Sequence, residues 1–379
     1  MSAITGNTIK DAGSSSHRYG MRLGLLLAVV LCLPVAQAAE DLTLVSWGGA
    51  YTKSQILAFV RPYEQRTDTR MEVLDYNGGL TELRNQVRSL NFRWDVVDLE
   101  MSDALRACEE GLLEPIHKHA LAPAPDGTAT REDFLSGSLT PCAVGTVIWS
   151  TALAYDPARL KQTPTRLEDF FDLERFPGPR GMRRTPKANL EWALIADGVP
   201  NHKVYEVLAT EAGLNRAFEV LTRIKPHIVW WDAGLEAPRL LDTRRVVMTT
   251  AYTGRIHDSN RVQGTDYQLL WDHQIWNIDL FGVPRGNPRA KQAWEFIRFA
   301  TATERLAEQA RHIPYGPVRR SSLSRLTPNE REHLPTREAN FKNAMQIDAG
   351  WWAKHYDRIR PRFDDWLAQP VQVPRKLPR

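Results

Sequence analysis

Two aromatic side chains flank a pair of glycines near the start of the chain, in the run Ser46-Trp47-Gly48-Gly49-Ala50-Tyr51. A short apolar strand over 42–45 is predicted to end there, and a helical pattern follows. The glycines leave the backbone open to close approach just before a helix N-terminus. Trp47 and Tyr51 offer flat apolar surfaces that could hold a molecule between them. The run lacks the glycine spacing and the lysine of phosphate-binding loops. It therefore indicates capture of another kind of ligand.

A second group of this kind is Trp230-Trp231-Asp232, which ends a predicted strand later in the chain. Side chains alternate along a strand, so one tryptophan should face the core and the other a ligand. We expect Trp231 to face the ligand, with Asp232 beside it.

The elements that must position these residues alternate between strand and helix. Strands over 41–46, 71–74 and 94–99 are separated by segments with apolar residues at helical spacing. This βαβαβ opening predicts an α/β fold with a parallel sheet and right-handed crossovers. We expect a proline- and arginine-rich loop over 176–186. Further strands are predicted over 145–155, 228–231, 246–251 and 278–283.

The N-terminal region has the pattern of a secretory signal. Arg22 precedes the apolar run 23–33, and Ala36-Gln37-Ala38 forms an A-x-A cleavage site. The apolar run is shorter than the roughly 20 residues that span a bilayer. We therefore expect residues 1–38 to be a cleavable signal peptide and the protein to be periplasmic. The first twenty residues fit no part of such a signal, so Met21 is an alternative start.

The cysteines agree with export. Of the three in the chain, Cys32 would leave with the signal, and Cys108 and Cys142 remain. An even pair in an oxidising compartment indicates a disulfide, which would stabilise the fold by about 3–4 kcal/mol. Two buried free thiols are the alternative.

Several functional classes find no support in the sequence. A formal charge of +4, without a basic stripe interleaved with aromatics, argues against nucleic acid as a partner. We find no Gly-x-Ser-x-Gly or His-Glu-x-x-His motif, so we expect a protein that is not an enzyme. A secreted hydrolase is a distant alternative. We also expect no metal and no cofactor.

Several stretches, taken in order, resemble the periplasmic solute-binding proteins of ABC importers, in particular the spermidine/putrescine (polyamine)-binding group. No single motif is specific, but the ordered set covers nearly all of the chain after the signal. The stretches are Trp47-Gly48-Gly49-Ala50-Tyr51, Trp94-Asp95-Val96-Val97-Asp98, Gly145-Thr146-Val147, Leu240-Leu241-Asp242, Val246-Val247-Met248, Phe281-Gly282-Val283-Pro284 and Ile313-Pro314-Tyr315-Gly316-Pro317.

The resemblance implies a two-lobed α/β fold of the type II periplasmic-binding-protein class, joined by three hinge crossings near Val147, Leu280 and Tyr315. Lobe one would comprise 39–147 plus 280–314, and lobe two 148–279 plus 315–379. It also implies a monomer whose two lobes close around a small solute. The closed form would then be recognised by an ABC permease in the inner membrane.

A polyamine is the solute that the resemblance favours. Such a ligand needs carboxylates for its ammonium groups and aromatic faces for its methylenes and for cation–π contact. The ligand-binding residues that we expect on these grounds are Trp47, Tyr51, Glu100, Asp103, Trp231, Asp232, Tyr252, Trp276, Asp279 and Tyr315.

One loop departs from the polyamine pattern. Where polyamine binders supply acids, this chain has the basic segment 183–189, with Arg183, Arg184 and Lys187 before a helix. Such a segment suits an anion. Two interpretations stay open: the loop lies at the surface, or the ligand is an amino-acid-derived (opine-like) zwitterion or an organic anion.

Overall fold

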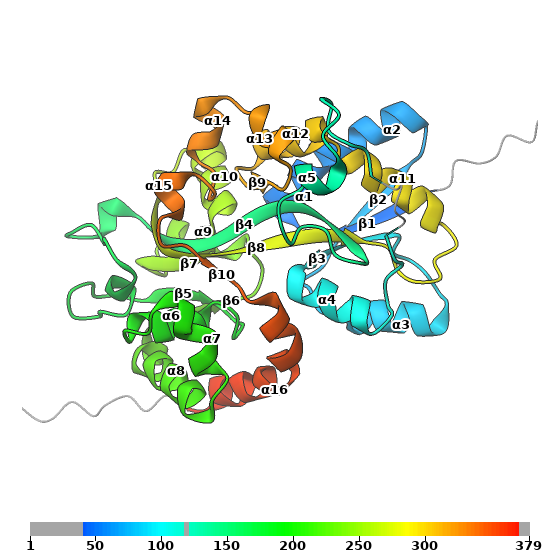
Figure 1. Cartoon of the computed structure of the whole chain (residues 1–379). Helices are drawn as coiled ribbons and strands as arrows, with labels where there is room; N and C mark the ends of the chain where they lie inside the picture. The colour runs from blue at the N-terminus through cyan, green and yellow to red at the C-terminus, as the bar shows by residue number, and fades with distance from the viewer. Residues whose placement is uncertain (1–40, 117–120, 371–379) are drawn as a thin grey trace, which may run out of the picture. The chain divides into compact units, whose positions relative to one another are not determined.

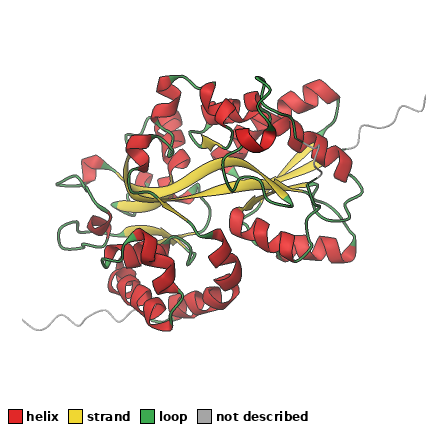
Figure 2. Cartoon of the chain, viewed as in Figure 1, coloured by secondary structure: helices red, strands yellow, loops and turns green. Residues whose placement is uncertain are grey.

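The computed structural model describes residues 41–116 and 121–370, so the predicted signal peptide lies outside the described residues. The described residues belong to one compact unit of mixed helices and strands (Figure 2). The strands are β1 (Leu42–Ser46), β2 (Met71–Asp75), β3 (Val96–Glu100), β4 (Ala143–Tyr155), β5 (Arg180–Arg183), β6 (Ile228–Trp231), β7 (Met248–Tyr252), β8 (Gln268–Gly282), β9 (Gly316–Pro317) and β10 (Met345–Gln346).

Helices cover these strands in the arrangement of Figure 1. A π-helical turn, Ile56–Val60, joins the first two of them. The helices are α1 (Gly49–Gln55), α2 (Arg61–Thr67), α3 (Thr81–Ser89), α4 (Met101–Glu109), α5 (Thr130–Asp133), α6 (Asn189–Ala196), α7 (Val204–Leu208), α8 (Glu211–Ile224), α9 (Glu236–Asp242), α10 (Thr253–Gln263), α11 (Ala290–Ala300), α12 (Thr303–His312), α13 (Arg320–Ser324), α14 (Pro328–Glu332), α15 (Glu338–Phe341) and α16 (Ala349–Ala368).

Local sequence sets several helix ends. The hydroxyl of Thr210 accepts a hydrogen bond from the backbone N–H of Gly213 at the start of α8, and the carboxylate of Asp348 does the same for Trp351 in α16. At the end of α10, Gly264 has a φ of 69°, the left-handed conformation in which glycine is favoured. These residues fix where the packed helices begin and end.

The predicted parallel opening is confirmed. β1 pairs in parallel with both β2 and β3, and Leu44 lies opposite Val73 and Val96. The strand order is β2-β1-β3-β8-β4-β7-β5-β6. β8 runs antiparallel to β3 and β4, whereas β5 runs parallel to β6 and β7. The sheet is therefore mixed, and β4 and β8 connect its two parallel groups.

Four strands differ from the sequence prediction: β5 and β8, and the two-residue strands β9 and β10, which were not predicted. β5 lies inside the segment 176–186, which we expected to be a loop. Its Arg180 is fully buried and donates hydrogen bonds to the carbonyl oxygens of Phe170 and Phe176 at 2.8 and 2.6 Å. A buried arginine satisfied by carbonyls leaves no apolar pattern to detect. β8 begins at Gln268, ten residues before the predicted strand, because its first half pairs with β4.

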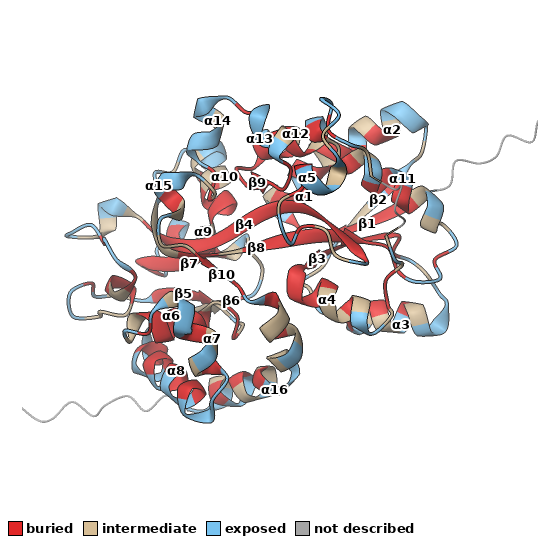
Figure 3. Cartoon of the chain, viewed as in Figure 1, coloured by how far each residue is buried: buried red, intermediate tan, exposed pale blue. Residues whose placement is uncertain are grey.

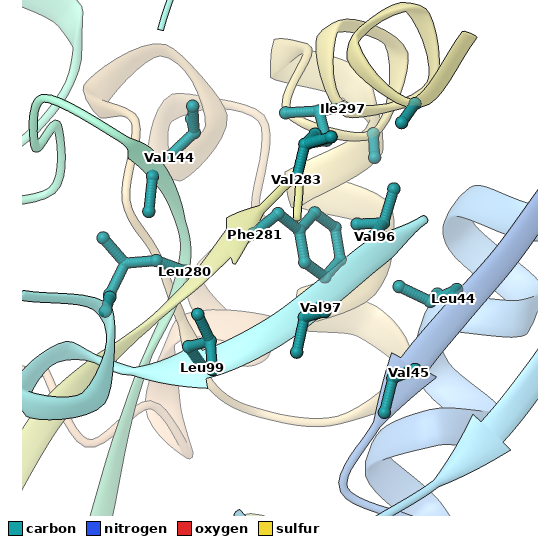
Figure 4. Close-up of a cluster of buried hydrophobic side chains, with 14 of the residues drawn as sticks. Leu44, Val45, Val96, Val97, Leu99, Val144, Leu280, Phe281, Val283 and Ile297 are labelled. Atoms are coloured by element: carbon teal, nitrogen blue, oxygen red, sulfur yellow. The ribbon is translucent and has the colours of Figure 1, made fainter. Parts of the chain in front are cut away.

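The chain buries two large hydrophobic clusters. The first contains β1, β3 and α11 side chains, and Figure 4 shows Phe281 among Val96, Val97 and Val283. The second lies around α6, α8 and α16. Residues of β4 belong to both: Val144 and Ile148 pack in the first cluster, Trp149 and Leu153 in the second. Figure 3 shows β4 and β8 as almost continuously buried where they connect the two. Two cores sharing two strands are the organisation of a two-lobed fold.

The predicted disulfide is present. Cys108 of α4 is bonded to Cys142, directly before β4, with the Cα atoms 5.7 Å apart. Within 41–116 and 121–370, no helix has the length and apolar composition to span a membrane.

Candidate functional site

A cavity opens where the two groups of strands meet, at the ends of β3, β5 and β7. Its lining comes from both sides of the β4–β8 pair. The lining residues are Trp47, Tyr51, Asn77, Glu100, Trp149, Arg183, Asp232, Gly234, Tyr252, Arg255, Asp279 and Tyr315.

Aromatic rings form much of the wall. The ring centroids of Tyr51 and Tyr315 lie 5.8 Å apart, and Trp149 meets Tyr252 edge to face at 5.2 Å. Trp47 contributes a further ring, supported by Tyr76 at 4.8 Å. Rings in these orientations present π faces and apolar edges, which suit methylene groups and cations.

Two buried carboxyl groups lie next to these rings. Asp279 lines the cavity, and Asp98 contacts Tyr51 from outside the lining. Asp279 accepts a hydrogen bond from the indole N–H of Trp149 at 2.6 Å. Asp98 accepts from the Tyr51 hydroxyl at 2.9 Å and from the Gln55 amide at 2.6 Å. Burial raises the pKa of Asp98 to about 7, despite these donors. Burial, and then the charges of Asp98 and Glu100, raise the pKa of Asp279 well above its ordinary value. The pair therefore favours a bound proton or a nearby cation.

Glu100, at the end of β3, is held in its charged form. Lys187 Nζ lies 2.8 Å from its Oε2, and Arg183 Nη1 lies 3.4 Å from Oε1. Burial alone would raise the pKa of Glu100, but these two cations lower it below its ordinary value. The two cations belong to the basic segment whose position the sequence left open. Arg183 lines the cavity and Lys187 is 8% exposed, so this part of the segment is buried.

Arg255 brings a cation whose charge no described carboxylate balances. It is 6% exposed, and Nη2 donates to the backbone oxygen of Trp47 at 3.2 Å. Nε and Nη1 are buried and have no hydrogen-bond partner among the described residues. Burying a guanidinium with unpartnered N–H groups costs free energy unless an anion balances the charge and accepts hydrogen bonds from these groups. Arg255 therefore has the properties of an anion-binding group.

Seven of the ten predicted residues line the cavity together: Trp47, Tyr51, Glu100, Asp232, Tyr252, Asp279 and Tyr315. Asp232 lies at the mouth, where its carboxylate is 3.6 Å from Arg184. Asp103 lines a neighbouring outer cavity instead, and accepts a hydrogen bond from the backbone N–H of Gly79 at 3.2 Å.

The two remaining predicted residues lie away from the cavity. Trp231 is 1% exposed, packs in the core around α9 and touches the ring of Tyr252 from behind. Its neighbour Trp230 packs on α16, because helices cover both faces of β6. Trp276 stacks on Phe341, with ring centroids 5.4 Å apart. Trp231 does line an adjoining cavity, which shares Glu100, Trp149, Arg183 and Tyr252 with the main one, so the assignment of Trp231 and Trp276 to the ligand site stays a prediction.

Four residues of the lining were not predicted from the sequence: Asn77, Trp149, Gly234 and Arg255. Trp149 lies inside β4, where nothing in the pattern separates a cavity residue from a core residue. Arg255 had a detectable signal: it stands in the first turn of α10, where the helix dipole disfavours a cation. Across the described ranges, no group of three or more His, Cys, Asp or Glu residues is arranged to hold a metal ion.

Comparison with known proteins identifies solute-binding proteins as relatives of this chain. The model of the family "Bacterial extracellular solute-binding protein" matches residues 58–336. A gamma-aminobutyric acid (GABA)-binding protein of Pseudomonas aeruginosa is 35% identical over 357 residues, which cover 94% of this chain and 99% of the relative.

Solved structures show the same likeness. A GABA receptor structure is 26% identical with a TM-score of 0.77, covering 88% of this chain and 100% of its own. The binding protein AgtB of A. tumefaciens R10, in complex with agropinic acid, is also 26% identical with a TM-score of 0.77, at 87% and 99% coverage. The spermidine/putrescine-binding protein PotD of Streptococcus pneumoniae is 13% identical with a TM-score of 0.65, at 86% and 99% coverage, so it shares the fold alone.

Proposed function

The chain belongs to the family of bacterial extracellular solute-binding proteins, and from this premise we propose that its solute is a small zwitterion of the GABA type. It is the substrate-binding component of an ABC transporter, and its family is periplasmic. We propose further that residues 1–38 are removed on export, and that the mature monomer delivers the solute to a permease by lobe closure.

Arg255 carries the proposal. Its buried Nε and Nη1 groups have no hydrogen-bond partner within 41–116 and 121–370, and they belong to a guanidinium that lines the cavity. A ligand carboxylate would supply the missing acceptors, as charge-assisted hydrogen bonds. A polyamine has no such group.

The other end of the proposed ligand is an ammonium group. Asp279 lies in the same cavity, and the rings of Tyr51, Trp149 and Tyr315 surround it. An ammonium there would stabilise the charged form of Asp279 and contact the π faces. The methylenes between the two charges would lie along the aromatic wall.

The polyamine expectation has the weaker support. The one clearly acidic group at the end of β3, Glu100, is already neutralised by Lys187 and Arg183. The relative with 35% identity binds GABA, whereas the polyamine-binding structure is similar in fold alone. The alternative raised by the basic segment, an amino-acid-derived zwitterion, therefore becomes the main proposal.

A larger, opine-like zwitterion is a second candidate. The outer cavity shares Trp47, Asn77 and Arg183 with the main cavity and has a mostly charged and polar lining. A solute with a polar extension could occupy both. AgtB, in complex with agropinic acid, has the same level of identity as the GABA receptor structure.

Calorimetric titration of residues 39–379 tests the proposal with four matched ligands: GABA, butyrate, butylamine and putrescine. We expect GABA to bind most tightly, because it alone satisfies both Arg255 and Asp279. Arg255→Met should remove binding of GABA, whereas Arg245→Met, at an exposed arginine, should not. Tighter binding of putrescine than of GABA by the unmodified protein would contradict the proposal.

A further inference from the structure

The side chain of Lys187 ends in a site built like the ammonium-binding site of an amine receptor. Nζ lies 2.8 Å from the Glu100 carboxylate and 2.7 Å from the Ser102 hydroxyl, and 5.0 Å from the centroid of the Tyr356 ring. A carboxylate, a hydroxyl and an aromatic face are the groups that hold a ligand ammonium. Lys187, Glu100 and Ser102 are each at most 8% exposed.

The loop that carries Lys187 is fixed in place. Asn189 donates through its amide nitrogen to the backbone oxygens of Arg183 and Thr185, at 2.7 and 2.8 Å. Between Lys187 and Asn189, Ala188 has a φ of 66°, which a residue with a side chain rarely adopts. The chain accepts this backbone conformation directly beside Lys187. The ammonium group is therefore held in one position.

Glu100, the acid that pairs with Lys187, also faces the main cavity. Glu100 lines that cavity as well as the outer one, so an amine that enters either cavity approaches this carboxylate. Lys187 and Arg183 together give two cations to one acid. A second ammonium on a ligand would find no free carboxylate there and would be repelled by both.

We propose that Lys187 is a specificity-determining residue, a tethered amine that fills the subsite where a diamine or polyamine would place an ammonium group. The inference rests on the proposed function, that the solute carries one ammonium and one carboxylate. The repulsion of a second amine is a case of selecting one ligand by disfavouring its competitor.

The test compares Lys187→Ala with Lys187→Arg, in titrations with GABA and with putrescine. In Lys187→Ala the carboxylate of Glu100 keeps only Arg183, 3.4 Å away, as a cationic partner, and we expect putrescine affinity to rise by about tenfold or more over the unmodified protein. Lys187→Arg keeps a cation in the subsite and should show no gain. A folded Lys187→Ala protein with unchanged putrescine affinity would overturn the proposal.

Two further variants make the result specific. Lys187→Met retains the apolar stem along Tyr356 and replaces Lys187→Ala if the latter fails to fold. Glu100→Gln combined with Lys187→Ala should lose the putrescine gain, and its persistence would also overturn the proposal. GABA binding by the unmodified protein tests the proposed function separately. If GABA does not bind, the comparison of putrescine affinities between the variants still tests the role of Lys187.

Discussion

The guanidinium of Arg255 occupies the space that a side chain on Gly49 would need. A β-carbon at Gly49 would lie 2.6 Å from Nη1 of Arg255, closer than such atoms ever approach. Gly49 also has a φ of 55°, in the left-handed region. The glycine pair at the start of α1 therefore makes room for a cation contributed by α10.

Gly49→Ala should weaken solute binding by about tenfold or more, because the new methyl group displaces the guanidinium from its position. It should also lower the free energy of unfolding by about 1–2 kcal/mol, from the positive φ alone. Calorimetric titration with GABA and thermal unfolding measure the two effects.

Gly264→Ala is the matched control for this variant. Gly264 has a φ of 69°, and a β-carbon there would meet nothing within 4 Å. The control should have a similar loss of stability with unchanged affinity. An equal loss of affinity in both variants would show that the contact with Arg255 is irrelevant.

Binding of a zwitterion should release a proton. The pKa of Asp279 is raised by burial and by Asp98 and Glu100, so the empty site favours the protonated carboxyl. A ligand ammonium favours the charged form, and affinity should therefore increase as pH rises towards the raised pKa of Asp279 and level off above it. Calorimetry in buffers of different ionisation enthalpy counts the proton. Asp279→Asn should bind more weakly without this release, and an unchanged proton count in that variant would contradict the assignment.

Ionisation of Asp98 should make the free energy of unfolding depend on pH. Its pKa is about 7 in the folded protein, whereas the ordinary value is 3.8. Between these two values the folded state binds more protons than the unfolded state, so the free energy of unfolding falls as pH rises, by up to about 1.4 kcal/mol per pH unit. Asp98→Asn lacks this loss, since it cannot ionise. Urea unfolding of both proteins at pH 5, 6 and 7 measures the difference, and parallel profiles would refute the prediction.

Removal of the disulfide should affect stability and leave recognition unchanged. Cys108 and Cys142 close a loop with a sequence separation of 34, which corresponds to about 3–4 kcal/mol in the chain-entropy model. Neither residue lines the cavity. Cys108→Ser with Cys142→Ser should unfold at a lower urea concentration and bind GABA with unchanged affinity below that point. A loss of affinity in the still-folded double variant would contradict this separation.

Sequence reasoning predicted the elements that depend on local pattern. The βαβαβ opening follows from apolar periodicity, and the positions of Tyr51 and Tyr252 on the cavity lining follow from strand ends. It was incomplete where tertiary contacts decide. β5 has no apolar signature because Arg180 is satisfied by backbone carbonyls. For Trp231, strand alternation could not indicate that helices cover both faces of β6.

The charge of the site was the hardest property to predict. The sequence offered Glu100 and Lys187 as unrelated residues, 87 positions apart, and only the fold brings their charged atoms within 2.8 Å. The family resemblance favoured a polyamine, and the acids appeared free to bind its amines. Pairing Glu100 with the basic segment removes that acid from the ligand and leaves the unbalanced Arg255.

β4 and β8 are single strands of 13 and 15 residues, paired through most of their length and anchored in both cores (Figure 1). The predicted crossing points near Val147 and Leu280 lie inside this ribbon. Any movement of one core against the other must therefore flex hydrogen-bonded backbone, and the register shifts at Gly145/Val147 and Thr151/Leu153 are where it bends most easily. Closure of the lobes, as proposed above, would have to bend this ribbon, so the stiffness of the ribbon would determine how readily the two cores approach each other.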